Sequence, residues 1–156
     1  MLTLGLAACG GEAEQPVEAN PEAPAGISVT DGRMNLPAVA GNPGAVYFTI
    51  RNDSDQQQMI MSAYVDGAES AMLHQTETWN LQPDMQEVLQ LPIPAGESLV
   101  FEPGGTHVMA MGVDETLQPG GEAEVTLTFS GGDKVSFKAK LLAAGQESAD
   151  GMEAGE

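Results

Sequence analysis

The stretch Glu124-Val125-Thr126-Leu127-Thr128-Phe129 alternates polar with apolar side chains. Such alternation predicts a β-strand with one face in a core, because successive side chains on a strand point to opposite sides. Pro119-Gly120-Gly121 precedes this stretch and Gly131-Gly132-Asp133 follows it, and both are typical turn sequences. The segment therefore predicts one strand of a sheet whose neighbours are joined by tight turns.

Short strand-like runs separated by turns continue through the whole central part of the chain. Further turns are indicated at Asn52-Asp53-Ser54-Asp55, Pro94-Ala95-Gly96 and Pro103-Gly104-Gly105. Prolines and glycines interrupt Gly32–Gly44, so we expect at most a turn or two of helix there. A single all-β domain is expected, a β-sandwich or Greek-key barrel of about eight to nine short strands. Candidate strands cover residues 27–31, 45–52, 58–65, 68–74, 85–90, 98–101, 107–113, 123–129 and 134–141.

The charge of the chain excludes one large class of partners. The 156 residues carry a formal net charge of −18 and only five Lys and Arg. Phosphate backbones are bound by clustered basic side chains, so no nucleic acid partner is expected. The two ends are small, acidic and poor in apolar residues, which predicts a disordered linker over residues 10–26 and a disordered tail over residues 142–156. The folded domain should then span residues 27–141.

The only cysteine, Cys9, stands near the start of the chain. Leu6-Ala7-Ala8-Cys9-Gly10 resembles a bacterial lipoprotein signal box, in which the cysteine receives the lipid. Residues 1–9 would then be a truncated lipoprotein-type signal, since no basic residue occurs before Arg33. The alternative is an apolar terminus with an incidental cysteine. The first interpretation places the protein in the periplasm, touching a membrane only through an N-terminal lipid anchor.

The two histidines of the chain are spaced from two methionines in a pattern that suits a soft metal ion. Ten residues separate His74 from Met85, twenty-one separate Met85 from His107, and one separates His107 from Met109. Residues two apart on a strand share a face, so His107 and Met109 can both face one ion. Two imidazoles and two thioethers favour Cu(I) over calcium, magnesium or structural zinc.

These spacings resemble the signature of the periplasmic copper chaperones of the PCu(A)C family, His-x10-Met-x21-His-x-Met. Further resemblance lies in Ala45–Asn52, in Pro103–Gly112 and in Leu117-x-Pro119-Gly120 with the strand that follows. The resemblance implies a monomeric cupredoxin-like barrel that binds one Cu(I) per chain through the four named side chains. It also implies delivery to cytochrome c oxidase, to its copper-bearing subunit or an assembly chaperone. Asp84 departs from the family, in which a basic residue is common before the methionine.

Three more side chains are candidates for an outer shell of the metal site. Met72 and Met111 each lie two residues from a predicted ligand, and Trp79 falls between two of them. Core packing is the alternative for the two methionines, and a surface anchor is the alternative for the tryptophan. Four soft donors leave no open coordination position, so we expect no enzyme. Two other functions remain open: a copper buffer or tolerance protein without a dedicated acceptor, and a metal-free β-sandwich interaction module.

Overall fold

The computed structural model describes residues 22–146 as ten β-strands in one continuous sheet, without an α-helix among them. Cys9, the lipoprotein-type signal, most of the predicted linker and residues 147–156 of the predicted tail lie outside the described residues. The all-β fold is confirmed, with ten strands instead of the expected eight or nine. The strands are β1 (Ile27–Asn35), β2 (Gly44–Asn52), β3 (Gln58–Val65), β4 (Ser70–Trp79), β5 (Gln82–Glu87), β6 (Leu91–Ile93), β7 (Ser98–Phe101), β8 (Thr106–Met111), β9 (Glu122–Phe129) and β10 (Lys134–Leu142).

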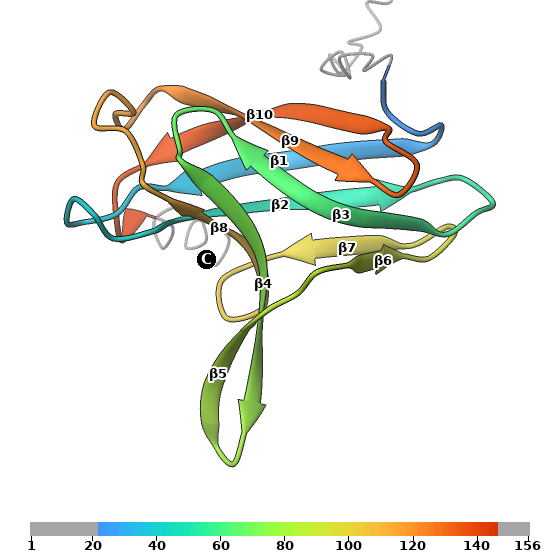
Figure 1. The fold of residues 1–156 in the computed structure, drawn as a ribbon, viewed down its shortest axis with the longest axis horizontal. Helices are drawn as coiled ribbons and strands as arrows, with labels where there is room; N and C mark the ends of the chain where they lie inside the picture. The colour runs from blue at the N-terminus through green and yellow to red at the C-terminus, as the bar shows by residue number, and fades with distance from the viewer. Residues whose placement is uncertain (1–21, 147–156) are drawn as a thin grey trace, which may run out of the picture.

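The strand order is β5-β4-β8-β7-β2-β1-β10-β9-β3-β6, with β8 also paired to β2. Most neighbours are antiparallel, but two pairs are parallel: β1 with β10, where Arg33 lies opposite Lys140, and β7 with β8. The strands wrap around a common core, and the hairpin of β4 and β5 projects away from the rest (Figure 1). At the centre of the core, the rings of Phe48 and Phe101 stack with centroids 4.0 Å apart.

Alternation in the sequence places the apolar side chains inside, as expected for strands with one buried face. In β9, Val125, Leu127 and Phe129 are buried and their neighbours are not. Apolar side chains from nine of the ten strands are buried together in one cluster. Its largest fully buried members are Phe48, Phe101, Phe129, Met34, Ile50, Ile60, Ile93, Leu127, Leu141, Val46, Val65 and Val108.

β1 and β6 differ from the expected strands for physical reasons. β1 continues past Asp31 to Asn35, because Asp31 adopts a left-handed φ of 59° and the pairing with β2 shifts register between Thr30 and Arg33. The Asp31-Gly32 pair is therefore a β-bulge within one strand and not the end of it. β6 is three residues long with a central proline, too short for an alternating pattern to indicate it.

The hairpin of β4 and β5 replaces the polar connection expected between His74 and Met85. Its strands pair from His74–Glu87 to Trp79–Gln82, leaving a two-residue turn. Both turn residues, Asn80 (φ 55°) and Leu81 (φ 66°), are left-handed, as a type I′ hairpin turn requires. β5 therefore spans Gln82–Glu87 and not the predicted 85–90. β5 contains Pro83 and is an edge strand, which is where a proline is tolerated in a sheet.

Candidate metal site

The predicted ligands lie on the face of the sheet that points away from the core. On β4, Leu73 is buried in the core opposite Val108 of β8. Because side chains alternate along a strand, the residues next to this pair project from the other face. Those residues are His74 on β4 and His107 on β8, and they are direct cross-strand partners.

The two imidazoles lie side by side. Their ring centroids are 5.8 Å apart and their planes are inclined by 49°. A metal–imidazole bond is about 2.0–2.1 Å long, so two such bonds and the two ring radii span roughly 6 Å. The spacing of His74 and His107 therefore leaves room for one ion held between the rings.

His107 is held in one orientation by its surroundings. The side chain is 6% exposed, and its Nδ1 lies 3.2 Å from the carbonyl oxygen of Gly105, to which Nδ1–H donates. Such a hydrogen bond fixes the tautomer and leaves Nε2 with a free lone pair for a metal. The ring of Tyr47 lies on the β2 side of His107 at 6.3 Å, and the Arg33 guanidinium lies 5.3 Å over that tyrosine ring.

His74 has no such partner. Its Nδ1 and Nε2 are both buried, and neither has a hydrogen-bond partner within the described residues. Leaving a buried polar atom unpaired costs about 1–3 kcal/mol, so a ligand that binds one nitrogen would relieve this cost. Burial lowers the pKa of His74 below its ordinary value, the nearby His107 lowers it further, and Glu87 acts in the opposite direction. The ring is therefore held in the neutral form that binds metals.

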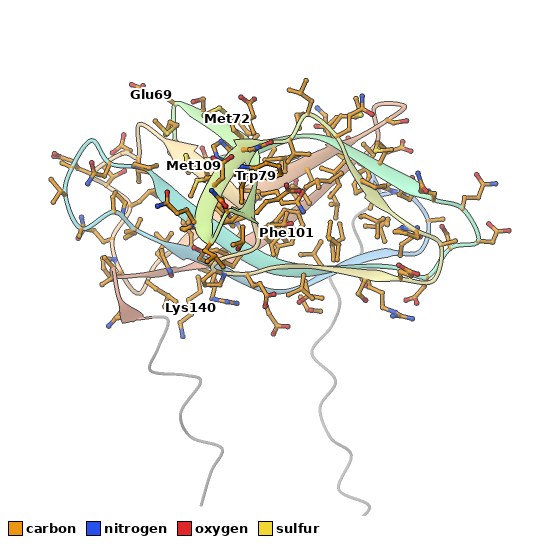
Figure 2. All side chains as sticks on the ribbon, turned by 90° about the horizontal axis from the view of Figure 1, so that it is seen from below. Glu69, Met72, Trp79, Phe101, Met109 and Lys140 are labelled. Carbon is orange, nitrogen blue, oxygen red and sulfur yellow. The ribbon has the colours of Figure 1, made fainter. Side chains whose placement is uncertain are left out.

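Thioethers flank the histidine pair on the same face. Met109 lies two residues from His107 on β8, and Met72 is its direct partner on β4. Met85 lies on β5, opposite Thr76, which places it diagonal to His74. Diagonal neighbours are about 7–8 Å apart at the backbone, still within reach of a long side chain. The structure thus brings His74, His107, Met109 and Met72 onto adjacent positions, with half-exposed Met85 one strand further out. Figure 2 labels Met72 and Met109 on these neighbouring strands.

The other two outer-shell candidates lie farther away. Met111 is on the ligand face but four residues beyond His107, opposite Ser70. Trp79 is at the hairpin tip, 79% exposed, on the alternate face of β4. Five residues of strand separate it from His74, roughly 17 Å at 3.4 Å per residue. The structure therefore does not bring Trp79 over the histidine pair and leaves it as an exposed apolar side chain.

Three contributors to the site were not singled out from the sequence: Tyr47, Gly105 and Glu87. Gly105 acts through its backbone carbonyl, which no side-chain pattern reveals. Tyr47 and Glu87 depend on which strands become neighbours, which no local pattern reveals. Within residues 22–146 no group of three or more His, Cys, Asp or Glu side chains is arranged to hold a metal ion. Over the same residues, no helix has the length and apolar character needed to cross a membrane.

Comparisons of the sequence match this chain to one family and to one curated relative. A family model described as "Putative lipoprotein LpqE-like" matches residues 27–141. A curated relative from Leifsonia xyli subsp. xyli (strain CTCB07), "Putative lipoprotein Lxx21020", is 31% identical over 132 residues, which cover 84% of this chain and 78% of the relative.

Solved structures share the fold. The solution structure of CuI-DR1885 from Deinococcus radiodurans is 31% identical and covers 73% of this chain and 78% of its own, with a TM-score of 0.57. The copper-bound PCuAC domain from PmoF2, at 19% identity, covers 76% of this chain and 93% of its own with a TM-score of 0.63, and supports the fold alone. The predicted resemblance to PCu(A)C domains and the cupredoxin-like fold are thereby confirmed. Because the family model spans all of β1 to β9 and nearly all of β10, this chain belongs to the LpqE-like family, a family of the PCuAC type.

Proposed function

We propose that this protein is an extracytoplasmic copper chaperone that binds one Cu(I) through His74, Met85, His107 and Met109. The observation that carries the proposal is the cross-strand histidine pair. One imidazole has its tautomer fixed by Gly105, and the other has two buried nitrogens without a protein partner. A metal ion between the rings would occupy the free nitrogen of each.

The chemistry of the donors favours Cu(I) as the cargo. Thioethers are soft, neutral ligands that select Cu(I), and imidazole suits copper as well. A relative supports the same assignment, since the 31% identical DR1885 is named as a CuI protein. Two imidazoles and two thioethers around one ion leave no position for a substrate, so the proposed role is binding and transfer, without catalysis.

The family supports a location outside the cytoplasm. Relatives carry the name lipoprotein, and Cys9 follows small residues as a lipid-bearing cysteine would. We place the domain in the periplasm on a lipid tether. There it would deliver copper to cytochrome c oxidase, to its copper-bearing subunit or an assembly chaperone.

The surface around the site supports transfer to an acceptor. From Asn52 to Asp133 the chain contains acids but no Lys or Arg. The β4–β5 hairpin, which carries Met85, also exposes Trp79 and Leu81 at its tip, the latter 95% exposed. Acidic surface attracts a basic partner and speeds encounter, and exposed aromatic side chains are typical anchors of interfaces. An acceptor with a basic rim and an apolar pocket would fit this hairpin.

Anaerobic titration with Cu(I) against a chromophoric competitor tests the proposal. We expect one equivalent to bind, and His107→Ala to lose most of the affinity. Met61→Leu on β3 is the matched control and should bind like the wild type. A wild-type protein that binds no Cu(I), or a His107→Ala variant that binds as tightly as the control, would reject the site.

A gene deletion separates delivery from buffering. Loss of a chaperone should lower oxidase activity at limiting copper, whereas loss of a buffer should lower survival at excess copper. The half-exposed position of Met85 favours delivery, because an acceptor can reach that ligand without unfolding the sheet.

A further inference from the structure

Four soft donors occupy a two-by-two patch on the outer face of β4 and β8. His74 is the cross-strand partner of His107, and Met72 is the cross-strand partner of Met109. Directly opposed residues of an antiparallel pair have Cβ atoms about 4.5–5.5 Å apart, closer than any diagonal pair. Met72 is thus as near to the histidine pair through the backbone as Met109 is.

Met85 has a different setting. It lies on β5, the edge strand of the hairpin that projects from the rest of the sheet (Figure 1). Met85 is 50% exposed, and its cross-strand partner is Thr76 instead of another soft donor. Met72 lies on an inner strand of the sheet and is only partly exposed. The proposed site therefore has one thioether that solvent or a partner can reach and another, on the opposite side of the histidine pair, that is better protected.

Core packing does not account for Met72. Its neighbour Leu73 belongs to the buried core, and alternation turns Met72 away from it. Among the described residues, Met72 is neither a member of the core cluster nor one of the partly buried apolar side chains packed against that cluster. Met72 lies on the same face as the predicted ligands, directly opposite Met109.

We infer that Met72 is a copper ligand of this protein and holds Cu(I) with His74, His107 and Met109 when Met85 leaves the ion. The inference rests on the proposed function and extends it to the hand-off. The bond between copper and the Met85 sulfur breaks and a bond to the Met72 sulfur forms. Copper stays Cu(I), and no proton moves because a thioether carries none. The exposed methionine is thereby freed while the ion remains bound.

A double-mutant cycle tests this inference, with anaerobic Cu(I) affinities of Met72→Leu, Met85→Leu and the double variant. Leucine keeps the apolar bulk and removes the sulfur, and Met61→Leu on β3 is again the matched control. Each single loss should cost less than about tenfold, because the other thioether replaces it. The double loss should cost on the order of 100-fold or more, since even changes outside the ligand shell cost 10–100-fold in metal affinity. If the loss of binding free energy in the double variant equals the sum of the two single losses, the inference is wrong.

X-ray absorption of the copper-loaded variants gives a readout independent of affinity. Met85→Leu should keep two sulfur scatterers around copper, and the double variant should keep one. The methyl ¹³C resonance of Met72 in Met85→Leu should also shift on copper loading, a measurement that leaves Met72 itself intact. One sulfur in Met85→Leu, with an unmoved Met72 methyl, would reject Met72 as a ligand. Failure of wild-type protein to bind Cu(I) would instead reject the proposed function.

Discussion

Copper retention should depend on pH through the two histidines alone. An imidazole binds a metal only when it is neutral, whereas a thioether has no proton to compete. Protons and copper therefore compete for His74 and His107, which lie on either side of the same proposed ion position. Once both rings take up a proton in the apoprotein, each further pH unit should lower Cu(I) affinity by about 100-fold, or tenfold for each imidazole.

The pKa of His74 sets the pH at which protons begin to compete with copper for this ring. Burial and the neighbouring His107 lower the pKa of His74, so this ring stays neutral to a lower pH than an unperturbed histidine. Competition at His74 should begin only at a lower pH than for an exposed histidine. His74→Ala should bind Cu(I) more weakly at every pH, and its limiting slope should fall from about 100-fold to about tenfold per pH unit.

The assay is the anaerobic competitor titration repeated from pH 8 downward with a competitor of known pH dependence. Met85→Leu is the control, because it removes a sulfur donor and should leave the slope unchanged. Retention that is constant down to roughly pH 4 would refute histidine ligation. Equal slopes for wild type and His74→Ala would refute a role for His74.

The same shift affects the stability of the apoprotein. The folded state holds the pKa of His74 below its unfolded value, so the unfolded state binds a proton more readily. Stability is then present above the unfolded pKa and is lost as pH falls toward the folded pKa. Copper, which binds only the neutral ring of the folded state, should oppose this loss.

Three further predictions concern the hairpin and the core. Leu81→Gly should stabilise the protein by up to about 1 kcal/mol in urea unfolding, because Asn80-Gly is the preferred type I′ turn and the left-handed strain of leucine disappears; a lower midpoint would contradict this turn assignment. Trp79→Ala should leave Cu(I) affinity unchanged but slow copper transfer to an acceptor, because Trp79 is exposed at the hairpin tip. A weaker Cu(I) affinity in this variant would show that Trp79 contributes to the metal site. Asn52→Ala should cost roughly 2–3 kcal/mol, seen as a lower Tm, because the fully buried amide of Asn52 donates to the carbonyls of Gln56 at 2.7 Å and Ile93 at 3.0 Å and these bonds would be lost.

Local patterns in the sequence were enough for most of the sheet. Two strands, Gln58–Val65 and Ser98–Phe101, have the predicted limits, because alternation and flanking turn residues mark both ends. The hairpin turn was missed because Asn80-Leu81 lacks the glycine that usually signals such a turn, and leucine is rare at positive φ. The parallel pairing of β1 with β10 joins the two ends of the domain, which no local pattern encodes.

The sequence predicted only part of the candidate metal site. The His107-x-Met109 spacing and strand alternation put those two residues on one face, and the structure bears this out. The sequence could not predict that Met72 and Met109 are equally near the two histidines, since this depends on β4 and β8 pairing in one particular register. A slip of one residue would turn His74 toward the core and Leu73 toward solvent.

The register of β4 and β8 is fixed by side chains on the core face of the sheet. Leu73 and Val108 are buried cross-strand partners, and each precedes or follows a histidine directly. Exposing either residue forfeits about 1.5–3 kcal/mol of burial, so the core holds the strands where the imidazoles face each other. The inner donors are therefore placed by the packed core, while Met85 is placed by an edge hairpin that contributes no residue to the buried cluster beyond Leu73. If the proposed ligands bind copper, the packed core fixes the inner ones and leaves the outer one within reach of a partner, which is what a protein needs if it must hold an ion and also release it.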